Sequence, residues 1–176
     1  MPVNSELTHN KMASGYEITL ATAADVPGIL ALQEANLPGS GGNLSVRQSA
    51  EWFQGTMAEM PLIVARRDDK VVGYMVTATL AAKTHVAIVQ AMLRQYPAPP
   101  DCYSYGPVCV AESDRGKGVA GAMFDRLRLE LPGRTAITFV RSDNSPSLYV
   151  HEKMGMRALG EFETAGVSYT ALAYRP

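Results

Sequence analysis

The most informative segment of this chain is VCVAESDRGKGVA, residues 108–120. An apolar run that is typical of a strand ends at Val110, a polar turn follows, and a helical pattern occupies residues 119–130. The first amides of a helix have no partner within the helix, and the helix dipole favours an anion beside them. Arg115 and Lys117 add positive charge, and the neighbouring glycines let a ligand approach the backbone closely. The segment therefore predicts a phosphate site, although an ordinary strand–turn–helix junction is the alternative.

The composition limits the class of protein. A chain of 176 residues has the size of one domain, and 47% hydrophobic residues are enough for one core. The formal net charge is -1, so no global field attracts nucleic acid or an anionic membrane, and anion binding has to be local. The sequence shows no apolar run of membrane-spanning length and no signal peptide. We therefore expect a cytoplasmic protein with neither nucleic acid nor membrane as a partner.

Cysteine usage points to a reducing compartment. Cys102 and Cys109 fall in one segment that we expect to be extended. Such a segment would hold them roughly 20 Å apart, too far for a disulfide. We expect both thiols to be reduced and Cys109, which stands between two valines, to lie in the core. No metal site is expected.

The order of apolar patterns predicts the fold class. The predicted strands are residues 16–20, 62–66, 71–77, 102–110, 135–140, 157–162 and 168–174, and the predicted helices are residues 22–36, 46–59, 85–96, 119–130 and 147–154. Strands joined by crossover helices pair in parallel, and hairpins pair antiparallel. We expect an α/β (α+β) fold with a mixed, mostly antiparallel sheet of about seven strands and helices on both faces. Residues 1–14 are expected to form a flexible arm and residues 15–176 a single domain.

The dipeptide Gly106-Pro107 interrupts the strand predicted at residues 102–110. Proline cannot donate to a strand ladder, and glycine weakens a strand interior. Because this strand is expected at the centre of the sheet, the interruption favours a bulge at which pairing ends. The backbone of residues 108–110 could then pair with an extended ligand that carries amides, as an added strand would. A local kink without a ligand is the alternative.

A second motif, NSPSLYVHEKMGM, occupies residues 144–156. Asn144 precedes Pro146, a pattern typical of an N-cap followed by an early-helix proline, although the asparagine amide could instead bind a ligand. Tyr149 lies on the same short helix and could have a functional role. The alternative is that it is an amphipathic tyrosine that only packs.

With both motifs in place, the sequence resembles the acyl-CoA-dependent N-acetyltransferases of the GNAT superfamily. Residues 115–120, RGKGVA, match the family's diphosphate loop, in which arginine or glutamine opens a pattern with two later small residues. Residues 144–156 match the next family motif: an asparagine, a tyrosine-bearing helix, a glycine and a large apolar residue. The resemblance extends from Tyr16 to Tyr174 in the order of elements. It implies the acyl-CoA N-acyltransferase fold and acetyl transfer from acetyl-CoA to a primary amine of a small molecule or peptide, without a metal.

The resemblance also implies a site. Acetyl-CoA is expected in a V-shaped opening between the strand that ends at Val110 and the strand that ends at Val140. The implied cofactor-binding residues are Val108, Val110, Arg115, Gly116, Lys117, Gly118, Val119, Ala120 and Asn144. Tyr149 matches the family's general acid, which protonates the departing CoA thiolate.

The chemistry of such a transfer leaves one role unassigned. A tetrahedral oxyanion needs a donor, which a free N–H of the interrupted strand can supply, and a tyrosine stays protonated at neutral pH. The attacking amine must also lose a proton. The histone-acetylating branch of the family uses a strand glutamate, but this chain has Ser104 there. A water chain, Glu34 and His85 are the alternatives for the base.

The acceptor and the assembly are less well indicated. The resemblance places the substrate walls at residues 37–44 and 163–167. An added helix, within about residues 81–100, could cover the substrate mouth, form a homodimer contact or only pack on the sheet. A non-catalytic acyl-CoA-binding or sensing domain of the same fold is the alternative function. A nucleotide-binding module is a weaker one, because no Lys-Ser/Thr pair closes the glycine-rich loop.

Overall fold

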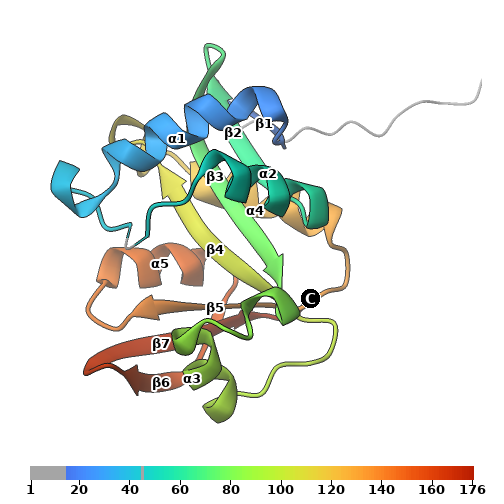
Figure 1. Cartoon of the computed structure of the whole chain (residues 1–176), viewed down its shortest axis with the longest axis vertical. Coiled ribbons are helices and arrows are strands. Elements are labelled where there is room, and N and C mark those ends of the chain that lie inside the picture. Colours follow the sequence, from blue (N-terminus) through green and yellow to red (C-terminus); the bar gives the residue numbers. More distant parts are fainter. Residues whose placement is uncertain (1–14, 45) are drawn as a thin grey trace, which may run out of the picture.

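A seven-stranded mixed sheet forms the centre of the molecule (Figure 1). The computed structural model describes residues 15–44 and 46–176, so the predicted arm at residues 1–14 lies outside the described residues. The strands follow the order β1-β2-β3-β4-β5-β7-β6, and only the β4–β5 pair is parallel. Their bounds are β1 (Glu17–Leu20), β2 (Ile63–Arg67), β3 (Lys70–Thr79), β4 (Tyr103–Val110), β5 (Ala136–Arg141), β6 (Arg157–Thr164) and β7 (Val167–Tyr174). The predicted mixed, mostly antiparallel sheet is confirmed.

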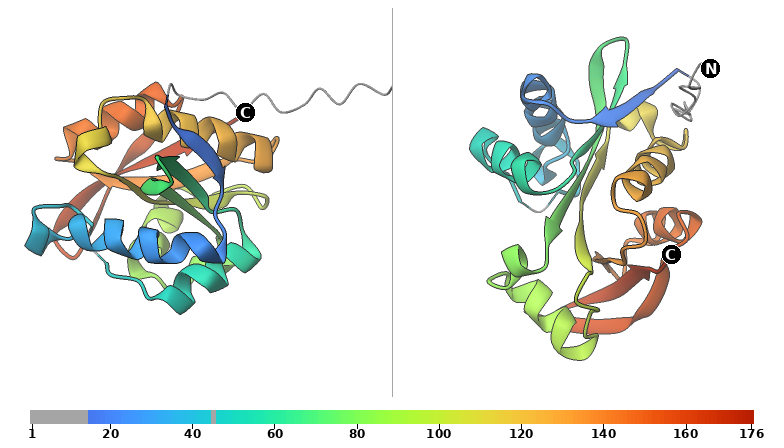
Figure 2. Two further views of the ribbon diagram at one scale, coloured as in Figure 1. Left: turned by 90° about the horizontal axis from the view of Figure 1, so that it is seen from above. Right: turned by 90° about the vertical axis from the view of Figure 1, so that its right-hand side faces the viewer.

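Helices cover both faces of the sheet, as predicted. They are α1 (Val26–Ala35), α2 (Ala50–Glu59), α3 (Ala87–Gln95), α4 (Val119–Glu130) and α5 (Ser145–Lys153). Figure 2 shows α1, α2 and α3 on one face and α4 and α5 on the other. The prediction of α2 began four residues too early, at Val46. The hydroxyl of Ser49 accepts the amide of Trp52 at 3.2 Å and so caps the helix at that point.

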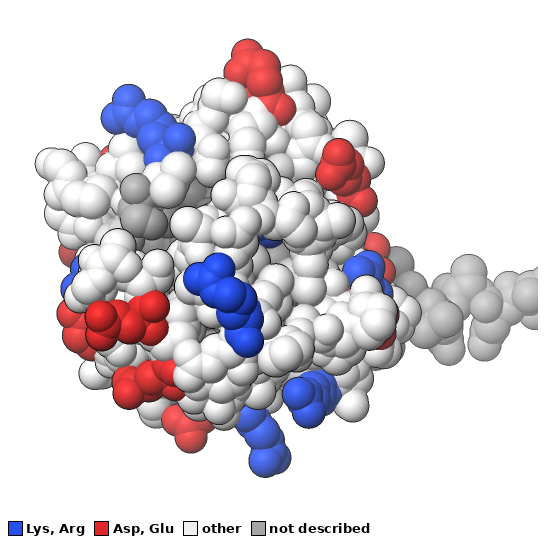
Figure 3. Space-filling view, turned by 60° about the horizontal axis from the view of Figure 1, so that its bottom comes forward, with Lys and Arg blue, Asp and Glu red and all other residues white. Residues whose placement is uncertain are grey.

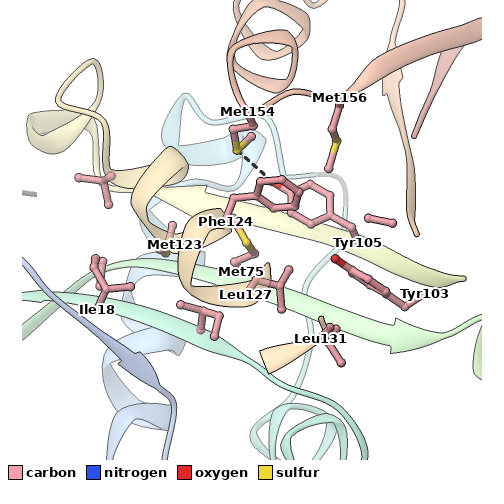
Figure 4. Close-up of a cluster of buried hydrophobic side chains, with 14 of the residues drawn as sticks. Ile18, Met75, Tyr103, Tyr105, Met123, Phe124, Leu127, Leu131, Met154 and Met156 are labelled. Carbon is pink, nitrogen blue, oxygen red and sulfur yellow. Dashed lines mark hydrogen bonds between the residues drawn. The ribbon is translucent and has the colours of Figure 1, made fainter. Parts of the chain in front are cut away.

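The largest core cluster lies between the sheet and α4 (Figure 4). Met123, Phe124 and Leu127 of α4 are at most 1% exposed and pack against Tyr103 and Tyr105 of β4. The rings of Tyr105 and Phe124 meet edge to face at 5.6 Å. Each such side chain contributes about 1.5–3 kcal/mol of burial free energy, so α4 is held firmly against β4. This packing fixes the N-terminus of α4 beside the end of that strand.

A second cluster joins α1 and α2 to the opposite face of β2 and β3. Phe53 of α2 meets Tyr74 of β3 edge to face at 5.7 Å, and both are fully buried. Cys109 belongs to this cluster, which confirms its predicted place in the core, and both cysteines are free.

The added helix predicted within residues 81–100 is α3, and it packs on the sheet. Val89 and Met92 bury themselves against Phe162 and neighbouring side chains of β5 and β7. The hydroxyl of Tyr96 donates to the carbonyl of Glu161 at 2.8 Å, which ties the end of α3 to β6. The helix therefore covers the part of the sheet that α1 and α2 leave open, on the face opposite α5 (Figure 2).

Charged side chains are scattered over the face that Figure 3 displays, with both signs separated by uncharged areas. None of the described helices is long and apolar enough to cross a membrane.

Candidate active site

The parallel pair at the centre of the sheet is open over most of its length. β4 and β5 pair only at Tyr103↔Ala136 and Ser104↔Ile137 and then diverge (Figure 1). We call the unpaired region between residues 108–110 of β4 and the second half of β5 the β4–β5 split. The predicted end of pairing near Gly106-Pro107 is therefore confirmed.

A bulge in β4 causes the divergence. The register with β3 passes from Thr77↔Tyr105 to Met75↔Val108, so Gly106 and Pro107 stand against a single residue of β3. Gly106 has a φ of 109°, a conformation that favours glycine, and Pro107 has no N–H to give to a ladder. An extra residue in one strand bends it and increases its twist, which carries residues 108–110 away from β5.

The bulge also determines which backbone groups face the split. The amide of Ala111 donates to the carbonyl of Val72 at 2.8 Å, so Ala111 points toward β3. Backbone groups alternate in direction along a strand, and Cys109 therefore also points toward β3. The N–H and C=O groups of Val108 and Val110 consequently point toward the split. No neighbouring strand pairs with this edge at the two valines predicted from the sequence, and the carbonyl of Val110 accepts a side-chain hydrogen bond from Arg115.

The inner end of the split is closed by a side chain. The hydroxyl of Thr138 on β5 donates to the carbonyl of Tyr105 at 2.8 Å, and Thr138 is 7% exposed. This bond satisfies the last β4 carbonyl before the bulge. The split therefore begins immediately beyond Tyr105.

The glycine-rich loop leads from the end of β4 into α4. Gly116 and Gly118 have φ values of 71° and 79°, which favour glycine, and an added Cβ at either would meet no atom of the described chain within 4 Å. The amide of Ala122 is the one that begins the helical ladder of α4, donating to the carbonyl of Gly118. The amides of Val119 and Ala120 thus belong to the open first turn, beside the split.

A buried carboxylate anchors this loop. Asp114 is 1% exposed and accepts hydrogen bonds from the hydroxyl of Tyr16 at 2.7 Å and from Ser113 and Arg67 at 2.9 and 3.2 Å. Burial alone would raise the pKa of Asp114, but these donors and the charge of Arg67 outweigh it and hold the pKa below its ordinary value. Asp114 therefore fixes the loop to Tyr16, which directly precedes β1, and to Arg67 of β2. Sequence inspection missed this residue.

The two basic residues of the loop differ in what they contact. Arg115 donates from Nε to the carbonyl of Val110 at 3.2 Å and from a terminal nitrogen to Oδ1 of Asn36 at 2.6 Å. Its side chain thus ties the loop to the end of β4 and the end of α1. Lys117 is exposed and forms no ion pair with any described residue.

Asn144 caps α5, as the sequence indicated. Its side-chain oxygen accepts the amide of Ser147 at 3.3 Å. The side-chain nitrogen has no protein acceptor among the described residues, so the N-cap role leaves a donor at the start of α5.

Tyr149 and His151 lie on different sides of α5. Tyr149 is 59% exposed, with the Lys153 amine 5.2 Å from the centre of its ring. His151 is 7% exposed and meets the Tyr105 ring edge to face at 5.5 Å. Two residues on a helix are separated by roughly 200°. The structure therefore brings His151 to the residue at which the split begins, whereas Tyr149 as the acid stays a prediction.

The bases considered from the sequence lie elsewhere. Glu34 is exposed and paired with Arg47 at 2.8 Å. His85 is exposed and precedes α3. Ser104 is partly buried on β4, a strand that carries no carboxylate. Sequence inspection missed His151 as a candidate, because the contact of its ring with Tyr105 arises from packing and leaves no sign in the local sequence. Among the described residues, no group of three or more His, Cys, Asp or Glu side chains could hold a metal ion.

Comparison with known proteins shows the family of this chain. The model of the acetyltransferase (GNAT) family matches residues 28–156, and the chain belongs to that family. No curated protein matches the sequence.

Solved structures share the fold at low sequence identity. An N-acetyltransferase from Staphylococcus aureus Mu50 is 19% identical, with a TM-score of 0.68 over 91% of this chain and 98% of the other. A ribosomal-protein-alanine N-acetyltransferase from Brucella melitensis is also 19% identical, with a TM-score of 0.66 over 91% and 99%. A GNAT phosphinothricin acetyltransferase from Sinorhizobium meliloti, in complex with acetyl-CoA, is 17% identical, with a TM-score of 0.68 over 92% and 88%.

Proposed function

We propose that this protein is an acetyl-CoA-dependent N-acetyltransferase that moves an acetyl group to a primary amine of a small molecule or peptide by direct attack. The observation that carries the proposal is the unpaired edge of β4 at Val108 and Val110, beside the open first turn of α4. The acetyl-CoA bound in the phosphinothricin acetyltransferase structure, on a similar fold, supports the choice of donor.

The residues present fit the donor. The pantetheine arm of CoA carries two amides, and the N–H and C=O groups of Val108 and the N–H of Val110 can pair with them as with an added strand. The carbonyl of Val110 already accepts a hydrogen bond from Arg115. The amides of Gly116 through Ala120, with the nearby charge of Lys117, suit a diphosphate. Arg115 contributes charge while its side chain holds the loop in place. The free amide nitrogen of Asn144 is a further donor for the arm.

The chain's own groups then serve the transfer. The acetyl thioester supplies an activated carbonyl. The Val108 N–H, next to the bulge, is the proposed oxyanion donor. Tyr149 is the proposed general acid for the CoA thiolate, and that role requires its exposed ring to turn from Lys153 toward the split.

A panel of amines tests the function. Purified protein with acetyl-CoA is offered an alanine-terminated peptide, phosphinothricin, tyramine and spermidine, and thiol release is followed. The first two follow the names of structural neighbours, and the last two represent aromatic and polycationic amines. Turnover with any of them supports the proposal. Tight acetyl-CoA binding by calorimetry without thiol release across a wide amine panel would favour the non-catalytic acyl-CoA-binding alternative.

Tyr149→Phe tests the acid. Loss of kcat with unchanged acetyl-CoA affinity is expected, because the phenol acts after the donor is bound. Equal losses in kcat and affinity would indicate a binding or packing role for Tyr149.

A further inference from the structure

His151 is a buried titratable group that the proposed mechanism does not use. Its ring lies edge to face with Tyr105, at 5.5 Å between ring centres. Tyr105 is the last β4 residue before the bulge, and Thr138 closes the inner end of the β4–β5 split on its carbonyl. His151 therefore lies beside the point from which the split opens.

The hydrogen bonding of His151 fixes its tautomer. Nδ1 lies 2.7 Å from the main-chain carbonyl oxygen of Ser147. A carbonyl oxygen can only accept, so Nδ1 carries the hydrogen, and the lone pair of the neutral ring is on Nε2. Nε2 has no hydrogen-bond partner in the described part of the chain. The ring thus holds a proton acceptor that the fold leaves unused.

The surroundings keep this ring neutral. Burial lowers the pKa of His151, and the opposing effect of the Ser147 carbonyl is smaller. The titratable group facing it from β4 is Tyr105, whose pKa is raised by burial, so that it stays protonated. Asp125 and Arg128 of the adjacent α4 pair with each other. A neutral imidazole at pH 7 is consequently ready to accept a proton.

We propose that Nε2 of His151 is the general base that takes the proton from the attacking amine. This role rests on the proposed acetyltransferase function. It assigns the general base, which the sequence analysis left open. As the amine nitrogen bonds to the acetyl carbon, its N–H bond breaks and the proton goes to Nε2. The carbon–sulfur bond then breaks with its electron pair going to sulfur. The thiolate takes a proton from the general acid, which is reprotonated by the imidazolium through solvent.

The competing bases are less well placed. Glu34 is exposed and engaged with Arg47, and His85 is exposed before α3. Among the described residues, neither side chain forms a hydrogen bond or ion pair with residues 108–110 of β4. His151, in contrast, contacts β4 directly through the ring of Tyr105.

The first test needs no acceptor. Protein labelled with 15N-histidine is titrated with CoA, and the imidazole nitrogens of the three histidines are followed by NMR, with signals assigned from His151→Gln and His85→Gln. We expect the Nδ1–H form of His151 at pH 7 and a shift of its Nε2 signal when CoA binds, with His85 unmoved. If CoA binds by calorimetry and the Nε2 signal does not move, the role of His151 is overturned. If CoA does not bind, the proposed function itself fails.

The second test is kinetic and uses the best acceptor of the amine panel. His151→Gln keeps a polar group, and His151→Phe keeps a ring against Tyr105. Loss of general base catalysis should lower kcat by roughly 100-fold in both variants, with acetyl-CoA affinity within about threefold of wild type. In the wild type, kcat should fall at acidic pH with a midpoint below the ordinary histidine pKa, because His151 is then protonated. This fall should be absent in both variants.

Three outcomes would overturn the role. One is a kcat of His151→Phe within about threefold of wild type, because packing alone would then suffice. Another is an acidic limb of kcat that persists in His151→Gln, and the third is its loss in His85→Gln instead. Thermal unfolding of each variant shows that the fold is retained.

Discussion

Replacement of Asp114 tests how the diphosphate loop is held. In Asp114→Ala the hydroxyl of Tyr16, in a residue that is 5% exposed, loses its acceptor. An unsatisfied buried donor costs about 1–3 kcal/mol. Arg67 is 42% exposed, so its ion pair adds at most about 1 kcal/mol. The expected loss of unfolding free energy is therefore about 1–4 kcal/mol, which lowers Tm by roughly 2–16 °C for a chain of this size.

Two matched variants apportion this loss. Asp114→Asn keeps an oxygen for the Tyr16 hydroxyl and removes only the charge, so it should cost about 1 kcal/mol. Tyr16→Phe removes the donor and leaves the carboxylate its other two partners. A double-mutant cycle of Tyr16→Phe with Asp114→Ala should show coupling, since the two residues share one hydrogen bond. Denaturant unfolding measures stability, and calorimetry should show acetyl-CoA binding weakened about tenfold or more in Asp114→Ala.

The charge of Asp114 also predicts a pH dependence. Its folded-state pKa is depressed, so the stability it contributes is fully present above the ordinary aspartate pKa of about 3.9 and is lost as pH falls through the lower folded value. The stability difference between wild type and Asp114→Asn should hold at pH 5 and shrink below about pH 4. The anchoring argument is refuted if Asp114→Ala unfolds within about 0.5 kcal/mol of wild type, or if it binds acetyl-CoA normally.

Substitutions of glycine test two further contacts. Gly118→Ala should lower the free energy of unfolding by about 1–2 kcal/mol, because of the positive φ, and should weaken acetyl-CoA binding. The control Gly133→Ala, with a similar φ of 73° at a distant turn, should lose as much stability and bind acetyl-CoA normally. Equal binding in both variants would contradict the assignment of the loop to the cofactor. In Gly160→Ala the new Cβ would clash with the Tyr96 hydroxyl, so we expect about 2 kcal/mol of destabilisation by chemical denaturation, reduced when Tyr96→Phe is combined with it. An unchanged cost in the double variant would mean that α3 is not held at this contact.

The fold was predictable because its strands and helices differ in apolar period. The hairpin of β2 and β3, the helix α4 and the strand β7 all follow patterns that local sequence shows directly. The interruption of strand pairing at Gly106-Pro107 could also be predicted, because proline cannot donate to a strand ladder and glycine weakens a strand interior. The start of α2 was misplaced, because the Ser49 cap competes with a permissive apolar pattern that begins at Val46.

The site was less predictable than the fold, because it depends on contacts between distant parts of the chain. Asp114 acquires its role from Tyr16, 98 residues away, and Arg115 acquires its structural role from Asn36. His151 carries no local sign of its proximity to Tyr105, since that contact exists only once α5 packs against β4. Local sequence indicates which groups have the right chemistry, and packing determines which of them meet.

Hydrogen exchange at single amides of β4 is the most direct measurement of the unpaired edge. In the free protein, the amides of Val108 and Val110 should exchange rapidly, while the amide of Cys109, which faces β3, should be protected. Saturation with CoA should slow exchange at Val108 and Val110 and leave Cys109 as it was. Protection of the two valines before CoA is added, or their continued rapid exchange once it is bound, would contradict the assignment of this edge to the cofactor.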